Sequence, residues 1–531
     1  MRTAAALLLL SFVACAAQTA APKSFLLADV HTSPFTTDPF MHGNTVQGDR
    51  YFLMQATMLD LIATAYGVPG ESVKGGPTWL ERDRYDLRAK VPPKTTQDDI
   101  KAMLRSLLAD RFHLVTTTGS APLPTYVLSA GTDKPKMTSA EDTGEGSCVG
   151  APPPPDAAPG APSYITVNCK GMSMAAFAQT LHDFASGYLD QPVVDDTKLT
   201  GTWNFSLKWT GRGELAKQGA DGISIFAAVE KQLGLRLELK TTPRPVFQVV
   251  SVNRAPTPNA ANIAEALPEI PAAPFEVTVI KPSAPDEKGF GRITGDRVET
   301  RAVPLMYLLT FGWDLNGNDK EAVVNAPKWL DAAKFDILAK AGANARMDRF
   351  ASGNAINYED LRSMVRTMFA ERFEMKSHME DRPVTAYTLV SAKPKLKPTA
   401  DPTEHTRCKE GPGPDGKDPR VENPVLNRLL TCQNMTVAQI GDELQHVANG
   451  YIYHSVLDGT GLKGSYDFTL SFSSADKVSA TGGDTTAGAD PNGAVSVFDA
   501  VNRQLGLRLE KTKRAYPVLV IDRISETPTE N

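Results

Sequence analysis

Five carboxylate positions of this 531-residue chain occur twice, at corresponding places in its two halves. The pairs are Asp49 with Asp296, Asp86 with Asp336, Asp110 with Glu371, Asp195 with Asp458, and Glu238 with Glu510. Two carboxylates that face one cleft at a defined separation can hydrolyse glycosidic bonds. A structural role is the favoured interpretation, because Asp86 is expected on the polar face of its strand and Asp110 at a helix end, where capping and ion pairs are common.

Other catalytic signatures are weaker. None of the eight histidines is repeated between the halves, and no HExxH or triad spacing is present, so an active site common to both halves cannot use histidine. Ser474 and Lys477 match the S-x-x-K pattern, but they open a Gly-, Ala- and Thr-rich loop. Residues 314–325 begin like a calcium loop without its Gly and Glu. The sequence predicts no catalytic residue, metal or cofactor, and leaves enzymatic activity undecided.

Four cysteines form two pairs at corresponding places in the halves: Cys148 with Cys169 and Cys408 with Cys432. An even, matched number in an oxidising compartment predicts one disulfide in each half. Each would stabilise its domain by about 3 kcal/mol in the chain-entropy model. Zinc is the weaker alternative, because neither pair has CxxC spacing or a neighbouring histidine.

Residues 1–20 are predicted to be an export signal, with a basic start, an apolar run of near ten residues and small residues after it. The run is shorter than the about 20 residues that a permanent membrane span needs. Two alternatives for processing remain open. Residues 12–15 resemble a bacterial lipobox, in which Cys15 is lipidated, whereas residues 14–16 form an A-x-A cleavage site. The expected location is periplasmic, outer-membrane-anchored or secreted, with membrane contact only through such an anchor.

Composition and length limit the classes of partner and the number of domains. The net charge is −5 and the pI is near 6.0, which argues against binding to a nucleic-acid backbone. The length exceeds the ceiling of roughly 250 to 300 residues for one hydrophobic core, so at least two domains are expected.

The domain boundaries follow from a tandem duplication. The sequence Gln-Leu-Gly-Leu-Arg-Leu-Glu occurs at residues 232–238 and again at 504–510. It predicts a helix that ends at Gly234 or Gly506 in the left-handed conformation and is followed by a strand. We expect a first repeat at residues 24–254, a Pro- and Ala-rich linker at 255–273, and a second repeat at 274–525.

Each repeat is predicted to be α+β, with mixed strands and helices, and to split into two subdomains at a Pro-rich excursion such as residues 131–163. The strongest helices are capped by Thr96 and Asn357 and carry six apolar residues at matched intervals. A shorter helix is expected to end near Gly67 in the first repeat and near Gly312 in the second.

Trp79 and Trp329 follow prolines in matched loops. Aromatic loop residues suit a binding surface for sugar or peptide, and these two are the candidate binding residues. The favoured interpretation is that each indole anchors its loop to the core.

Several motifs together carry a family resemblance: Gly-Asp-Arg, the Gly-Pro-x-Trp-Leu loop, the Leu-Leu-Ala-Asp-Arg-Phe helix end, the Thr-Gly-x-Trp/Tyr-x-Phe strand and the Gln-Leu-Gly-Leu-Arg-Leu-Glu joint. The chain resembles an exported soil-bacterial family of unknown function, whose domain also occurs fused to antirepressor metallopeptidases of the β-lactamase-sensor type. The resemblance covers nearly all of the sequence after the signal, twice. It implies no catalytic residues, and the fusions imply recognition at the cell envelope.

Three functions therefore compete. The first is a non-enzymatic recognition module for an envelope protein, peptide or glycan, doubled for avidity. The second is an envelope hydrolase that depends on Asp195 or Asp458. The third is a structural or assembly protein, because the helix–Gly–strand joint is similar to short amino-terminal domains of secretins and TonB receptors.

Overall fold

The computed structural model describes residues 23–132, 134–140, 146–151, 164–189, 191–215, 221–268, 274–284, 286–350, 353–413, 416–478 and 493–530. The predicted export signal with Cys15 lies outside these residues. Two compact units are present: Thr118–Phe247 forms the smaller, and the rest of the described chain, including the whole second repeat, forms the larger.

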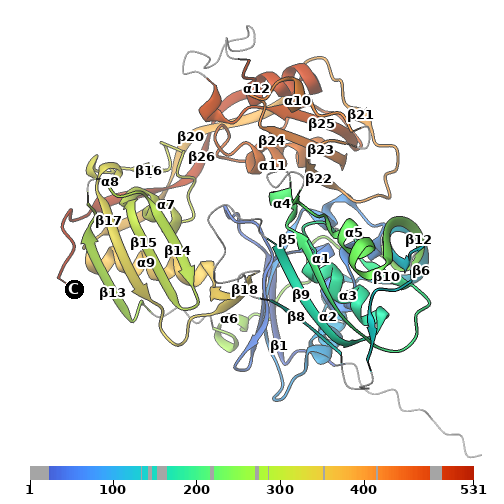
Figure 1. Ribbon diagram of the computed structural model, residues 1–531. Helices are drawn as coiled ribbons and strands as arrows, with labels where there is room; N and C mark the ends of the chain where they lie inside the picture. The colour runs from blue at the N-terminus through green and yellow to red at the C-terminus, as the bar shows by residue number, and fades with distance from the viewer. Residues whose placement is uncertain are drawn as a thin grey trace, which may run out of the picture. The chain divides into compact units, whose positions relative to one another are not determined.

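Each repeat begins with a four-stranded antiparallel sheet covered by helices. In the first repeat the strands are β1 (Leu27–Thr32), β2 (His42–Gln47), β3 (Arg50–Thr57) and β5 (Arg84–Lys90), in the order β1-β5-β3-β2. In the second repeat they are β13 (Val277–Pro282), β14 (Phe290–Thr294), β15 (Arg297–Pro304) and β17 (Lys334–Lys340), in the equivalent order. The helices are α1 (Met58–Tyr66) and α2 (Gln97–Phe112), matched by α7 (Leu305–Gly312) and α9 (Tyr358–Arg372). Figure 1 shows α9 against one face of its sheet.

The helices begin where the sequence predicted. Thr96 accepts a hydrogen bond from the backbone N–H of Asp99, whose carboxylate accepts one from the Thr96 N–H. The side chain of Asn357 caps α9 by accepting from the backbone N–H groups of Glu359 and Asp360. Gly67 closes α1 with φ 65°, in the left-handed region. Helix α7 ends at Gly312, as predicted, and the positive φ of 55° falls two residues later, at Asp314.

The second part of each repeat is built on two long strands. In the second repeat these are β20 (Lys376–Ser391) and β26 (Leu507–Arg523), which pair antiparallel along their whole length. With β16 (Val323–Val324) and β24 (Val456–Asp458) they form a sheet in the order β16-β26-β20-β24. A further sheet, β21-β25-β23-β22, contains β21 (Lys397–Pro398), β22 (Arg407–Glu410), β23 (Arg428–Met435) and β25 (Tyr466–Phe472). Helices α11 (Val437–Val447) and α12 (Val497–Ala500) cover it.

The first repeat has the same elements. Its long strands are β6 (Val115–Ala130) and β12 (Leu235–Ser251), in a sheet of order β10-β6-β12-β4 with β10 (Val193–Asp196) and β4 (Val73–Lys74). The further sheet, β7-β11-β9-β8, contains β7 (Thr138–Ser139), β8 (Ser147–Gly150), β9 (Tyr164–Met172) and β11 (Trp203–Thr210), with helices α3 (Met174–Phe184) and α5 (Ile225–Ala228). The fold is thus mixed α and β, as predicted.

The repeated seven-residue motif has a structural explanation. Gly234 and Gly506 take φ values of 70° and 68°, and a Cβ on Gly234 would lie 2.7 Å from the carbonyl oxygen of Lys134. The side chain of Gln232 both donates to the carbonyl oxygen of Lys208 and accepts from its N–H, and Gln504 does the same with Ser471. The glutamine therefore extends the hydrogen bonding of a strand edge, and the glycine allows close backbone contact.

Both predicted disulfides are present, Cys148–Cys169 and Cys408–Cys432. Each joins neighbouring antiparallel strands, β8 to β9 and β22 to β23. Each therefore lies inside one repeat and does not link the two.

Residues after each repeat return to its α2 or α9 helix. Arg111 of α2 donates to the carbonyl oxygen and hydroxyl of Thr257, and Arg372 of α9 makes the same contacts with Thr529. Part of the predicted linker 255–273 is therefore packed against the first repeat. These contacts give the arginine of the Asp-Arg-Phe motif a structural role.

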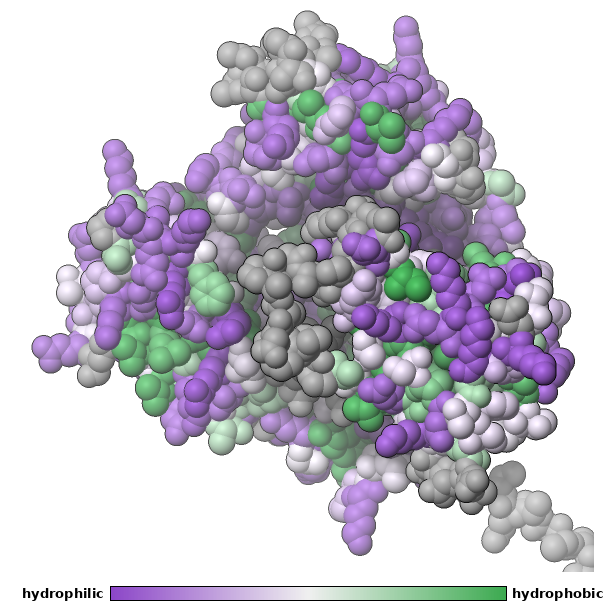
Figure 2. Space-filling view, in the orientation of Figure 1, coloured by the Kyte–Doolittle hydropathy of each residue, from purple (hydrophilic) through white to green (hydrophobic). Residues whose placement is uncertain are grey.

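Hydrophilic residues cover most of the visible face of the molecule, and hydrophobic ones form small separate patches (Figure 2). None of the helices in the described part of the chain is both long enough and apolar enough to cross a membrane.

Candidate functional site

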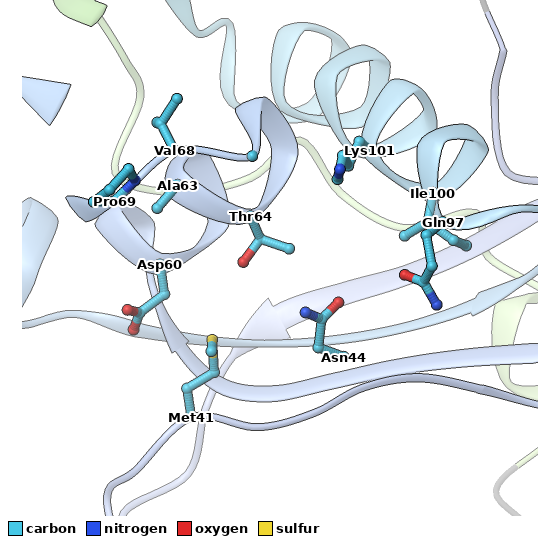
Figure 3. A pocket seen from close by; sticks show the side chains of 11 residues that line it. Met41, Asn44, Asp60, Ala63, Thr64, Val68, Pro69, Gln97, Ile100 and Lys101 are labelled. Atoms are coloured by element: carbon cyan, nitrogen blue, oxygen red, sulfur yellow. The ribbon is translucent and has the colours of Figure 1, made fainter. Parts of the chain in front are cut away.

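A pocket of about 370 Å³ lies in the first repeat, between α1, the start of α2 and strand β2. Figure 3 shows its lining, in which Thr64 and Gln97 point from the two helices toward the strand that carries Asn44. Its other lining residues are Met41, Asp60, Ala63, Gly67, Val68, Pro69, Ile100 and Lys101. The pocket thus combines an apolar rim with amide, hydroxyl and ammonium groups, which suits recognition of a small segment or ligand.

Two of its polar groups are held by the frame of the subdomain. The carboxylate of Asp60 accepts from the backbone N–H of Thr57 at 2.9 Å, as the capping box of α1. The amide oxygen of Asn44 accepts from the Tyr51 hydroxyl at 2.9 Å. Burial raises the pKa of Tyr51, so its hydroxyl keeps the proton that it donates. Asn44 is therefore fixed in orientation.

Lys101 is the cation of the pocket. Its ammonium group lies 3.2 Å from a carboxylate oxygen of Asp98, one turn earlier on α2. Asp98 is 90% exposed and Lys101 41%, so this pair is weak. Lys101 is therefore available to a ligand.

The equivalent face of the second repeat carries different residues at the same helical positions. Matching the helix starts pairs Thr64 with Phe311, Gly67 with Asp314, Gln97 with Tyr358, and Lys101 with Arg362. Here Arg362 is 3% exposed and forms ion pairs with Asp314 at 2.7 Å and Glu359 at 2.6 Å. Its guanidinium also lies 5.7 Å from the centre of the Phe311 ring.

This second face is occupied by a segment of the same chain. Arg362 donates to the hydroxyls of Thr36 at 3.2 Å and Thr37 at 3.4 Å, and Asp314 accepts from the backbone N–H of Thr37 at 3.0 Å. Thr36 is 6% exposed as a result. Burial raises the pKa of the next residue, Asp38, while the charge of Arg362 opposes that rise. An ion-paired arginine and aspartate thus hold a Thr-Thr segment that bends at Thr37.

The two tryptophans predicted as binding candidates do not line the pocket. Trp79 lies in a short 3₁₀ helix (Thr78–Glu81) and is partly buried against the core of its subdomain. Trp329 begins α8 (Trp329–Ala332) and packs against the equivalent core of the second repeat. Whether the indoles act mainly as anchors stays a prediction.

The expectation that Asp86 lies on a polar strand face is wrong. Its side chain is buried, and one oxygen accepts from the Ser33 hydroxyl at 2.6 Å and from the Gln55 backbone N–H at 2.9 Å. In the second repeat one carboxylate oxygen of Asp336 accepts matching hydrogen bonds from the Ser283 hydroxyl and the Ala302 backbone N–H. Gln55 and Ala302 have positive φ at a bulge, so the carboxylate satisfies an N–H that the bulge withdraws from the sheet.

The carboxylates of the hydrolase alternative are also engaged locally. Asp195 accepts from the N–H of Thr197 and Asp458 from that of Thr460, each at 2.8 Å, in matched turns. Ser474 of the S-x-x-K match hydrogen-bonds to Asp476 and Asn427. Within the described ranges, no group of three or more His, Cys, Asp or Glu side chains could hold a metal.

Comparison with known families gives one match. The family described as "Protein of unknown function (DUF3738)" matches residues 59–252 and again 306–524. The chain belongs to this DUF3738 family. Searches of curated proteins and of solved structures returned no significant match. The two matched regions agree with a tandem duplication of the DUF3738 domain, and each contains one α1–α2 or α7–α9 face.

Sequence reasoning missed this face. The available signal was a difference between the repeats at matched positions. Gly67 of the first repeat corresponds to Asp314 of the second, and Lys101 corresponds to Arg362. These positions differ between the copies within an otherwise repeated frame.

Proposed function

We propose that this protein is an exported recognition module whose repeats bind polypeptide segments on the face between their first two helices. One observation carries the proposal: the second repeat holds Thr36 and Thr37 there through Arg362 and Asp314, while the matching face of the first repeat is an open pocket. The second face is used within the chain, and the first is left for a partner at the cell envelope.

Further observations support the proposal. A polypeptide segment offers backbone groups that amide and hydroxyl side chains such as Gln97 and Thr64 can bind. The two disulfides suit an oxidising compartment outside the cytoplasm. The resemblance to domains fused to envelope antirepressors points to the same place.

Selection of phage-displayed random octapeptides on the oxidised full chain tests the proposal. We expect enriched sequences whose binding is lost in Thr64→Phe, because the larger side chain fills the pocket that Thr64 lines. Thr64→Ser keeps a hydroxyl and leaves the space open, so it is the matched control and should bind normally. If Thr64→Phe binds every selected peptide as well as the parent does, the α1–α2 face is not the recognition site.

A further inference from the structure

Gly67 and Lys101 indicate what the open pocket binds. We propose that the first repeat recognises an aspartate or glutamate side chain within a polypeptide segment of its partner, and that this carboxylate takes the place that Asp314 holds in the second repeat. The inference rests on the proposed function and adds the chemical class of the ligand.

The geometry at Gly67 carries the argument. Gly67 and Asp314 occupy the same position counted from the first residues of α1 and α7, with φ of 65° and 55°. A Cβ built on Gly67 would lie 3.5 Å from the Nζ atom of Lys101. A carboxylate at that position would therefore meet the cation of the first repeat, as the carboxylate of Asp314 meets Arg362.

The first repeat keeps the cation but lacks the built-in acid. Arg362 forms ion pairs with two carboxylates, Asp314 and Glu359, whereas the one ion pair of Lys101 among the described residues is with the exposed Asp98. A ligand carboxylate would complete the missing half of this arrangement. Charge-assisted hydrogen bonds of this type are roughly twice as strong as neutral ones.

The bound segment of the second repeat favours a side-chain carboxylate over a chain end. Thr36 and Thr37 lie in the interior of the chain, and the acidic Asp38 follows them within the electrostatic reach of Arg362. In the first repeat the fixed amide of Asn44 and the side chains of Thr64 and Gln97 are placed to meet the backbone of such a segment, with Met41 and Val68 at the rim.

A second copy of this chain is a poor occupant. Its Thr36–Asp38 segment already lies on its own second repeat. The corresponding loop of the second repeat, from Ser283 to Gly295, is three residues shorter than that from Ser33 to Gly48 and lacks the Thr-Thr pair. The partner is therefore a different polypeptide.

Three synthetic peptides test the inference by fluorescence anisotropy on the oxidised full chain. They are acetylated, amidated Phe-Thr-Thr-Asp-Pro-Phe, the same peptide with Asn for Asp, and Phe-Thr-Thr with a free carboxyl terminus. We expect the Asp peptide to bind about tenfold more tightly than the Asn peptide, the factor that one charge-assisted contact supplies. Tightest binding by the free-terminus peptide would overturn the assignment to a side chain.

Two substitutions at Gly67 separate charge from size. Gly67→Asp installs the acid of the second repeat at a φ that Asp314 already adopts, so the Asp peptide should bind about tenfold more weakly. Gly67→Asn has the same shape without the charge and should change binding less than about threefold. Lys101→Gln should abolish the preference for Asp over Asn.

The outcomes distinguish the two proposals. Equal binding of the Asp and Asn peptides, with both lost in Thr64→Phe, overturns the carboxylate inference and leaves segment recognition intact. Binding that no pocket variant changes overturns both. If none of the three peptides binds while phage selection succeeds at this face, the carboxylate assignment fails alone.

Discussion

The α1–α2 face of the first repeat and the α7–α9 face of the second have the same frame and different contents. In both, an arginine of the longer helix donates at 2.6 Å to a carbonyl near the end of the shorter one, Arg105 to Ala65 and Arg366 to Gly312. The frame is kept, yet one face is an open pocket and the other binds a segment from 277 residues away. The same frame therefore carries an internal contact in the second repeat and an accessible pocket in the first.

The largest expected effect comes from removing the cation of the occupied face. Arg362→Ala leaves Asp314 without its partner next to buried Thr36, and breaking a buried pair costs about 3 to 5 kcal/mol. Lys101→Ala removes the matched cation of the open face, where the loss should be about 0.5 kcal/mol. Urea unfolding of the full chain measures both. Equal losses would show that the two faces do not differ in the way that their contacts indicate.

The two disulfides should contribute similar amounts to the free energy of unfolding of their repeats. Their sequence separations are 21 and 24 residues, and loops of this size give about 3 kcal/mol each in the chain-entropy model. Cys169→Ser and Cys432→Ser are therefore expected to lower the free energy of unfolding by comparable amounts, measured by denaturant titration without reductant. Peptide mapping that finds free thiols or cysteine pairs between repeats would contradict the shared design.

Alanine substitution of the two tryptophans compares how much each matched loop contributes to stability. Trp329→Ala should lower the free energy of unfolding by about 2 kcal/mol, because the indole is partly buried against its core, and Trp79→Ala should do the same in the first repeat. Thermal melting of the full chain is the measurement, and of the second repeat alone if residues from Phe275 fold independently. A melting temperature within about a degree of the parent would favour an exposed binding surface instead.

The smallest effect is expected at the bulge of the second repeat. Hydrogen bonds from the Ser283 hydroxyl and the Ala302 N–H hold the pKa of Asp336 below its ordinary value. A lowered folded-state pKa gives stability above the unfolded pKa near 4, which is lost as the pH falls through the folded value. Asp336→Asn should therefore flatten the acid side of the stability curve, followed by circular dichroism. Exposed Asp331→Asn is the control, and an identical acid slope in both variants would contradict this role.

Local chemistry explains why much of the fold could be predicted. The Thr96 capping box, the left-handed Gly234 and Gly506, and the copy-matched cysteines depend on residues close in sequence or on the repeat itself. Such signals act within a few residues, so they appear in the order of amino acids. The candidate site could not be predicted in this way, because it was recognised from the hydrogen bonds that Thr37 forms with Asp314 and Arg362, which are distant in sequence.

The sequence by itself determined the duplication, the mixed α and β class, the helix starts and the disulfide pairing. Only the tertiary structure decided that Asp86 is buried, that Asp314 takes a left-handed conformation two residues after α7, and that one of two equivalent faces is filled. The physical reason is the range of the interactions. Caps and turns are set by neighbours along the chain, whereas burial and the occupation of a surface are set by groups that folding brings together from distant positions.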